Sequence, residues 1–475
     1  MMYCFLKCIY SKKRFFLCGF ICICSILSNA QNYNSFYEKG TQEFDKRNYF
    51  AAAVYFKQSH ELAPEITAIS YKLAEALINA HAYEKALEIF TDIINKKSEK
   101  YPLAYYYQAV LQKTLGQYDN AVSSFRFYSK HTNSNDPFHQ ESITEAQLCE
   151  SALASQKTNN PIIYKLQKKI NSIFSETSIS EYEDSVLIYS KLTPNNDTTA
   201  FLARVFSNKH IYKYDNLVQT INSLNTNVSD ICLSPDKKIA YFSSSIDSIG
   251  ISSSKIYSTQ FDSLRWTTPI ELLEPINISG TNNTQPYLAN INGKTYLFFV
   301  SNRPNGFGKL DIWYSIYENH TFTNAINLGP EINSEGDDVT PFYDTLTHCL
   351  YFSSDSRKGF GGLDIFSNHG YPLKWSKSQN LGHDINSSFN ECYFNISQNH
   401  KRSYFTSNRS PISIDDTHYY FNDYYFFYNN ELLNDLKDTI AQEKRKASNP
   451  IIDSVVTEKY TLYFDIGQPS HTDNK

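Results

Sequence analysis

Methionine is nearly absent from this sequence of 475 residues, and its cysteines are unevenly distributed. Both methionines are the first two residues, and five of the nine cysteines precede residue 25. The other four, Cys149, Cys232, Cys349 and Cys392, lie far apart and form no CxxC pair. This spacing argues against a disulfide framework and against zinc ligands in pairs. We expect four small buried side chains, and we predict no metal and no cofactor.

The sequence also lacks the short motifs of common enzymes. GxSxG, HExxH, GxxxxGK[ST] and GxGxxG are all missing, and the twelve histidines form no close pair at ligand spacing. We therefore predict no catalytic residues and a protein that is not an enzyme. A hydrolase with an unrecognised site stays as an alternative, because serine and histidine are plentiful.

Basic charge is scarce after the first thirty residues. Those thirty hold four Lys or Arg and no acid, and the remaining chain has 40 basic and 49 acidic residues, a formal charge of −9. Such a chain has no basic footprint for nucleic acid. Aromatic residues make up 15%, with 37 Tyr and 32 Phe, which argues against disorder and favours a β-rich fold.

Residues 1–30 have the pattern of a signal peptide. Lys12, Lys13 and Arg14 precede an apolar run from Phe15 to Leu27, and small residues frame a cleavage site after Ala30. The run is too short for an ordinary membrane span, and no later stretch is long enough. We predict an exported protein with no transmembrane span after cleavage. A lipid anchor on Cys22 or Cys24 is the less favoured alternative.

A helical repeat follows in residues 31–155. A small residue precedes a tyrosine by nine positions, and an alanine and a phenylalanine follow that tyrosine at i+3 and i+7, on one helical face. The tyrosines are 34 and 35 residues apart. The three sets are Gly40, Tyr49, Ala52, Phe56; Ala74, Tyr83, Ala86, Phe90; and Ala109, Tyr118, Ala121, Phe125. We interpret the aromatic side chains as core residues.

Over residues 33–133 this pattern resembles the tetratricopeptide repeat. The family usually has a tryptophan in the first helix, where this chain has Phe36, Ser70 and Tyr106. Residues 137–155 read as one more amphipathic helix, which covers the open end of the stack. The resemblance implies a groove for a protein or peptide partner, formed by the first helix of each pair.

A longer repeat occupies residues 161–429. Two markers recur at intervals of 51 to 57 residues: an Ile-Asn pair and, about twenty residues later, an aromatic residue in a short strand. The pairs begin at Ile170, Ile221, Ile276, Ile332 and Ile385, and the strand residues are Tyr189, Phe242, Phe299, Phe352 and Phe405. A third strand follows in units two to five, and a fourth is predicted after it in the middle units.

Four short strands repeated five times predict an all-β propeller, because radial packing buries both faces of every sheet. We expect five blades, with six as the alternative. The last unit stops after its third strand, and a spare strand at residues 161–166 precedes the first. We predict that this early strand completes the last blade and closes the ring, since open edges promote aggregation. The overall prediction is a multidomain α + β protein.

The sequence pattern of the repeat is clearest in units three and four. Asp311 and Asp364 follow glycine turns, and we interpret them as caps on backbone N–H groups rather than as metal ligands. Arg303, Arg357 and Arg409 follow the aromatic strands in register, so they either pair with the neighbouring blade or bind a partner's carboxylate or carbonyl groups. With the SPD turn at Ser234, this pattern resembles the PD40 or TolB-type (WD40-like) propeller repeat.

The carboxyl end changes in character. Residues 430–459 are charged and polar and predict a short helix and linker, and residues 460–475 contain one strand pattern, Tyr460–Ile466. This fragment resembles the opening strand of an OmpA-like domain. The part of that family that binds the cell wall is absent, so peptidoglycan binding is not carried over to this chain.

Together, these patterns resemble repeat–propeller–OmpA proteins of the Gram-negative envelope, including those of type IX secretion and gliding. The resemblance implies a periplasmic scaffold, associated with the outer membrane, that binds protein partners through the helical groove and a propeller face. The alternative from another class is a sensor that binds a peptide or carbohydrate in the propeller channel.

Overall fold

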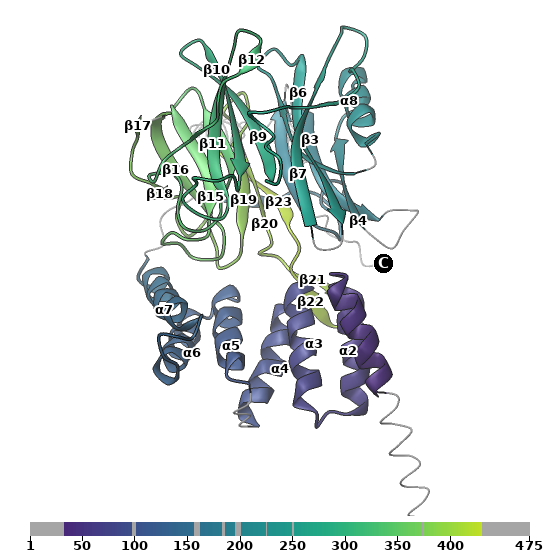
Figure 1. Cartoon of the computed structure of the whole chain (residues 1–475), viewed down its shortest axis with the longest axis vertical. Helices are drawn as coiled ribbons and strands as arrows, with labels where there is room; N and C mark the ends of the chain where they lie inside the picture. Colours follow the sequence, from purple (N-terminus) through teal and green to yellow (C-terminus); the bar gives the residue numbers. More distant parts are fainter. Residues whose placement is uncertain are drawn as a thin grey trace, which may run out of the picture. The chain divides into compact units, whose positions relative to one another are not determined.

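The computed structural model describes residues 33–96, 101–155, 162–182, 186–194, 201–224, 226–248, 251–372 and 374–429 (Figure 1). The chain divides into two compact units, and the first combines the residues up to Gln147 with Ser413–Tyr419. No helix in the described ranges is long and apolar enough to cross a membrane. The predicted signal peptide, the linker and the OmpA-like segment lie outside the described residues.

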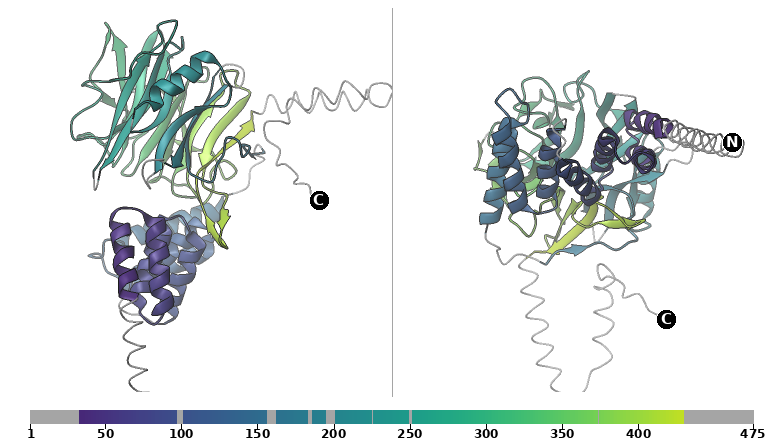
Figure 2. Two further views of the ribbon diagram at one scale, coloured as in Figure 1. Left: turned by 90° about the vertical axis from the view of Figure 1, so that its right-hand side faces the viewer. Right: turned by 90° about the horizontal axis from the view of Figure 1, so that it is seen from below.

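The first unit is a stack of antiparallel helices, as predicted. After a helix over residues 33–45 come α2 (Tyr49–Leu62), α3 (Thr67–Asn79), α4 (Tyr83–Asn95), α5 (Leu103–Thr114) and α6 (Tyr118–His131), and α7 (His139–Ala154) spans the boundary between the units. Figure 2 shows the helices in succession from purple to blue. A short hairpin, β21 (Ile412–Ile414) and β22 (Thr417–Tyr419), also belongs mainly to this unit.

The repeated residues form the core of this stack. The small residues, the alanines and the phenylalanines are all buried, whereas Tyr49 and Tyr118 are only half-buried. Gly40 shows why the first position is small, since a Cβ there would lie 2.7 Å from a ring carbon of Phe56. The helix pairs therefore approach closely where the repeat places a residue with little or no side chain.

The second unit is a five-bladed propeller, which confirms the predicted fold (Figures 1 and 2). Each blade is an antiparallel sheet, and its strands are given from the axis outward. The first blade has β2 (Glu176–Tyr182), β3 (Val186–Pro194) and β4 (Phe201–Ser207), and the second has β5 (Asn227–Leu233), β6 (Ile239–Ser248), β7 (Ile251–Gln260) and β8 (Ile270–Glu271). The third has β9 (Asn283–Ile291), β10 (Lys294–Ser301) and β11 (Asp311–Glu318) with β12 (Thr321–Phe322) and β13 (Ile326–Asn327); the fourth has β14 (Asp338–Asp344), β15 (Cys349–Ser354) and β16 (Asp364–Tyr371) with β17 (Lys374–Trp375) and β18 (Gln379–Asn380); and the fifth has β19 (Glu391–Ile396), β20 (Arg402–Ser407), β23 (Asp423–Tyr428) and β1 (Tyr164–Lys165). Each innermost strand contacts the innermost strands of both neighbouring blades, and β19 contacts β2.

The repeated aromatic residues of the second strands fill the space between blades. Phe242, Phe299, Phe352 and Phe405 are fully buried. Each packs with apolar residues of its own blade and of an adjacent one. Burial of an aromatic side chain stabilises a fold by about 2–3 kcal/mol, so this repeated position is a main source of blade cohesion.

Two expectations for the blade edges differ from the structure. The fourth strand is reduced to segments of two residues, such as β8 and β17. The first blade has three strands in its sheet and is followed by α8 (Tyr212–Asn222), a helix that the β-repeat interpretation overlooked. The helix buries Tyr214, Leu217 and Ile221, and this i, i+3, i+7 spacing is the signal that could have revealed it.

The ring closes as predicted from the spare strand. β1 pairs with β23 in antiparallel register, Tyr164 opposite Phe426 and Lys165 opposite Tyr425. The backbone N–H of Leu166 donates to the carbonyl of Tyr424 at 2.9 Å, and Lys165 Nζ lies 2.5 Å from Asp423 Oδ2. The first and last blades are thereby joined by backbone pairing rather than by side chains alone.

Glu176 gives this seam a pH dependence. Its carboxylate accepts hydrogen bonds from Ser172 N and Oγ, both at 2.7 Å, yet burial raises its pKa from 4.5 to about 8. The folded state then binds a proton that the unfolded state releases, so the free energy of unfolding should fall as pH rises from about 4.5 to about 8. Glu176→Gln should remove this pH dependence, which amounts to a few kcal/mol in the free energy of unfolding over that pH range.

Urea unfolding followed by tryptophan fluorescence, from about pH 5 to about pH 9, measures this effect. The exposed Glu335→Gln is the control, and it should keep the wild-type slope. Parallel pH profiles for wild type and Glu176→Gln would contradict the assignment.

Candidate functional site

The asparagine of each Ile-Asn pair acts as a substitute for a strand. Its Oδ1 accepts from a backbone N–H in the third strand of the preceding blade, and its Nδ2 donates to the carbonyl of the same residue. The ten bonds span 2.7–3.2 Å and join Asn171 to Tyr424, Asn222 to Val205, Asn277 to Ile256, Asn333 to Ile312 and Asn386 to Ile365. The spacing marked these residues as a repeat but gave no indication of this role.

The three arginines in register are engaged within the propeller. Arg303 donates to the carbonyl groups of Pro275 and Ile276 at 3.0 and 2.6 Å, and its guanidinium lies 4.6 Å from the Phe299 ring centroid. Arg357 and Arg409 likewise donate to the carbonyl groups of Ile332 and Ile385 and lie over Phe352 and Phe405. These carbonyl groups belong to the connections between blades, so the geometry favours pairing with the neighbouring blade.

Lys191 takes the corresponding place in the first blade. Its Nζ donates to the carbonyl of Ile170 at 3.5 Å and lies 5.1 Å from the Phe206 ring centroid. A lysine offers a point charge instead of a planar fork, so the first blade has a weaker version of the same link. Sequence reasoning missed this residue, since it lies two positions after Tyr189 and out of register with the arginines.

Asp311 and Asp364 cap the glycine turns. The Asp364 carboxylate accepts from the N–H groups of Phe360 and Gly361 at 2.8 and 3.1 Å, and Asp311 makes the corresponding contacts. A Cβ on Gly359 would come within 1.9 Å of Asp364 Oδ2, so the turn requires glycine. Among the described residues no cluster of three His, Cys, Asp or Glu side chains could hold a metal ion.

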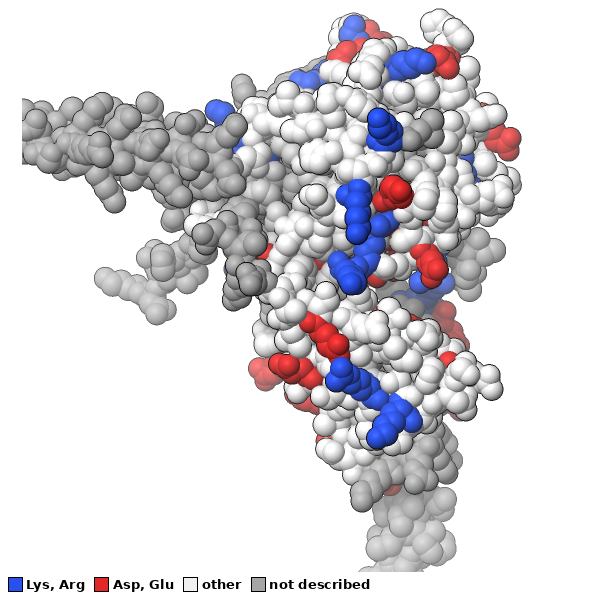
Figure 3. Space-filling model, turned by 90° about the vertical axis from the view of Figure 1, so that its left-hand side faces the viewer, with Lys and Arg blue, Asp and Glu red and all other residues white. Residues whose placement is uncertain are grey.

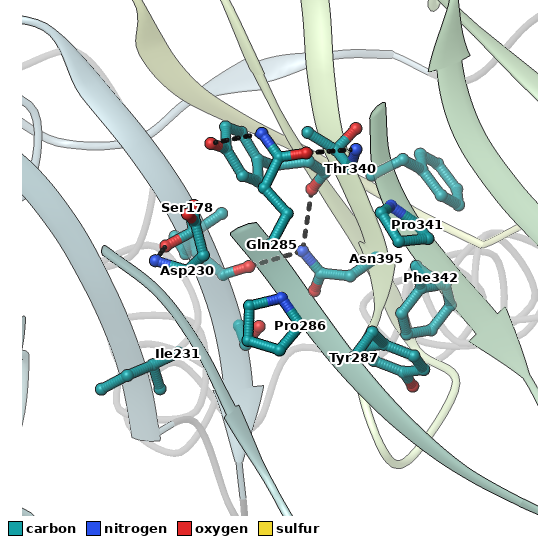
Figure 4. Close-up of a pocket in the computed structure, with 14 residues that line it drawn as sticks. Ser178, Asp230, Ile231, Gln285, Pro286, Tyr287, Thr340, Pro341, Phe342 and Asn395 are labelled. Atoms are coloured by element: carbon teal, nitrogen blue, oxygen red, sulfur yellow. Dashed lines mark hydrogen bonds between the residues drawn. The ribbon is translucent and has the colours of Figure 1, made fainter. Parts of the chain in front are cut away.

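The candidate site lies on the propeller axis, where the five innermost strands meet. Each of these strands carries a bulge in its pairing. In four of them a residue other than glycine has a positive φ there: Asp230 (55°), Gln285 (53°), Thr340 (54°) and Tyr393 (56°). Such backbone is uncommon and costs about 1–3 kcal/mol, and bulges redirect side chains. All four residues, with Ser178, line a cavity of about 50 Å³ (Figure 4).

Hydrogen bonds around this cavity link neighbouring blades. The N–H of Asp230 donates to Ser178 Oγ at 3.0 Å, and the N–H of Thr340 donates to Gln285 Oε1 at 2.8 Å. Asn395 Nδ2 donates to the carbonyl of Ile179 at 2.6 Å, across the closure between the last and first blades. The left-handed backbone at Asp230 and at Thr340 is therefore held by a side chain of the adjacent blade.

The electrostatics of the cavity centre on Asp230. Asp230 is the one acid among the described lining residues, and its Oδ1 is buried without a hydrogen-bond partner of standard geometry. Burial, and then the charge of Asp230, raise the pKa of Tyr393 well above 10, so this hydroxyl stays protonated. Burial also raises the pKa of Tyr287 well above its usual value.

The volume limits what the cavity can bind. About 50 Å³ accommodates a small ion or a few water molecules, whereas sites for organic ligands usually measure about 300–1,000 Å³. Glycoside hydrolysis generally needs two carboxyl groups about 5–9.5 Å apart, and the described lining residues supply one.

No family model matches the sequence, and no curated protein matches it. Among solved structures, the Arabidopsis OM64 TPR domain is similar over 25% of this chain and 97% of its own length, with 15% identity and a TM-score of 0.23. An α-L-arabinofuranosidase from Lactobacillus brevis is similar over 55% of this chain and 92% of its own length, with 13% identity and a TM-score of 0.34. An endo-arabinase from Bacteroides thetaiotaomicron gives 14% identity and a TM-score of 0.33, over 55% of this chain and 96% of that one. Likenesses this distant say nothing about activity.

The arginine links make a direct prediction for stability. Arg303→Ala leaves two carbonyl groups without their donor and removes the cation from the rings of Phe299 and Trp313. We expect the free energy of unfolding to fall by roughly 2–4 kcal/mol. Lys294→Ala, at an exposed position of β10, should change it by less than about 0.5 kcal/mol. Urea unfolding measures both, and equal losses would contradict the role given to Arg303.

Proposed function

We propose that the protein is a non-enzymatic scaffold whose helical unit binds a segment of a partner protein in the bacterial cell envelope. The observation that carries this proposal is an aromatic face formed by the first helix of each pair. The sequence resemblance implies that a tetratricopeptide-like stack binds its partner through residues on this face.

Half-buried tyrosines concentrate on this face. Tyr71 in α3 stacks on Tyr101, which lies two residues before the start of α5, with ring centroids 5.1 Å apart. Tyr107 in α5 stacks on Phe90 at 5.4 Å, and Tyr71 packs edge-on against the same ring at 5.5 Å. The phenylalanine belongs to the core, so the tyrosines form a rigid layer above it. Rigid, partly exposed tyrosines are typical anchors of protein interfaces.

Lys72 lies among these rings. Burial by itself would lower its pKa, but the hydrogen bond that Lys72 donates to Glu75 at 2.7 Å, together with the negative charge of Glu75, raises it. Tyr37 on the first helix and Tyr107 on the fifth also influence that pKa. One cation therefore neighbours three successive first helices. Burial raises the pKa of Tyr71 and of Tyr107 above 10, so the tyrosine hydroxyls remain neutral and can donate to a partner's backbone.

The remaining parts of the proposal come from the sequence. The signal pattern of residues 1–30 supports export, and the PD40-type and OmpA-like resemblances support a periplasmic site near the outer membrane, in secretion or gliding machinery. The face drawn in Figure 3 has charges of both signs dispersed over a largely uncharged surface, which fits a protein partner better than nucleic acid. The small volume of the propeller cavity favours the scaffold over the sensor of peptides or carbohydrates.

Charge reversal on this face tests the proposal. Lys72→Glu places an acid beside Glu75 and the tyrosines, and it should lower recovery of crosslinked partner proteins from native envelopes by about fivefold or more. Lys57→Glu makes the same change at an exposed position of α2, the second helix of its pair, and should leave recovery unchanged. The measurement is crosslinking and affinity capture with the full-length chain, followed by membrane fractionation.

Two results would contradict the proposal. One is capture of no protein partner by the wild type, with the bulk of the chain free in the periplasm. The other is an equal loss of partner with Lys72→Glu and Lys57→Glu, because the face of the first helices would then have no special role.

A further inference from the structure

The carboxylate of Asp230 is buried with an incomplete set of partners. The side chain is 6% exposed. Its Oδ2 accepts from Ser229 Oγ at 2.9 Å and from Thr284 Oγ1 at 3.3 Å. The Tyr393 hydroxyl also donates to this carboxylate, but Oδ1 is shielded from solvent and accepts no hydrogen bond of standard geometry. A buried carboxylate oxygen that accepts no hydrogen bond of standard geometry lowers the stability of the folded protein.

No protein cation compensates this charge within the cavity. None of the 14 lining residues is Lys, Arg or His (Figure 4). Buried charges in proteins are normally paired or coordinate a metal ion. The axis of the propeller therefore carries one unbalanced negative charge.

The other polar groups around the cavity are neutral oxygen donors. Ser178, Thr340 and Tyr393 contribute hydroxyl groups, and Gln285 and Asn395 contribute amide groups. Four of the five innermost strands adopt left-handed backbone to direct such residues to the axis, and the bonds from neighbouring blades hold them there. Hard oxygen ligands on rigid backbone suit alkali and alkaline-earth cations.

The charge and the volume select among these cations. Ca²⁺ sites usually gather several carboxylates among 6–8 oxygen ligands, and here one carboxylate is present. A cavity of about 50 Å³ has room for an ion with one or two water molecules. We propose that the cavity on the propeller axis binds one monovalent cation, Na⁺ or K⁺, with Asp230 as its charged ligand. The ion would join the blades at the point on the axis where their innermost strands meet, independently of what the helical unit binds.

Cation-dependent stability of the full-length chain tests this proposal. All three tryptophans, Trp266, Trp313 and Trp375, lie in the propeller, so their fluorescence follows the unfolding of this unit. Thermal unfolding is compared in NaCl, KCl and tetramethylammonium chloride at constant total chloride, with a chelator of divalent ions present. The midpoint should rise by roughly 3–5 °C for each tenfold increase in Na⁺ or K⁺ above the dissociation constant. Tetramethylammonium is too large for the cavity and should have no such effect.

Two variants separate the site from general salt effects. Asp230→Asn keeps the shape of the side chain and removes its charge, and it should abolish the difference between the salts. Asp262→Asn makes the same change in net charge in an exposed turn, and it should preserve the wild-type difference. If Asp230→Asn does not fold, broadening of the ²³Na resonance by the wild-type protein, reversed by K⁺, tests binding directly.

Three results would overturn the proposal. Equal midpoints of the wild type in all three salts would show that no monovalent cation binds. A preserved difference in Asp230→Asn would place the ion elsewhere. A larger stabilisation by Ca²⁺ than by Na⁺, measured without chelator and lost in Asp230→Asn, would show that the site is divalent.

Discussion

The propeller depends on one side-chain interaction repeated five times, the pairing of an asparagine amide with the backbone of the preceding blade. An amide side chain carries one donor and one acceptor, as a peptide unit does, so it can complete a strand edge with a single residue. In this chain the Ile-Asn pair extends the third strand of each blade where the fourth strand is short. The same pair at Asn171 reaches Tyr424, 253 residues away, and joins the two ends of the ring.

The other repeated residues stabilise the same junctions. At three of the five junctions, the carbonyl of the isoleucine that precedes the asparagine accepts a hydrogen bond from an arginine. This arginine lies over the repeated aromatic residue in the second strand of the next blade. Lys191 performs this role in the first blade. Aromatic burial, cationic contact and amide pairing thus converge on each connection between blades. The result is a ring that can direct uncommon left-handed residues to its axis, and the helical unit has its own face of half-buried tyrosines.

Much of this organisation could be predicted from the sequence, because both repeats combine a period with a local pattern. Helical spacing placed Ala52, Phe56 and their counterparts in the core, and the spare strand before Ile170 predicted the closure of the ring. The pairing role of Asn171 could not be predicted, since its partner lies at the other end of the propeller. The axial site was missed for a related reason: Asp230, Gln285, Thr340 and Tyr393 share no residue type, and only the bulges make them equivalent. The helix α8 was overlooked because its marker, Ile221, fitted the β repeat as well.

Asparagine pairing closes the five-bladed ring, and hydrogen–deuterium exchange at the amide of Tyr424 measures this pairing at the junction of the first and last blades. If Asn171 closes the ring, this amide is protected as strongly as the corresponding amides of Ile312 and Ile365, which pair with Asn333 and Asn386. In Asn171→Ala, exchange at Tyr424 should become faster while that at Ile312 stays unchanged. Rapid exchange at Tyr424 in the wild type, or no change in the variant, would show that Asn171 does not close the ring.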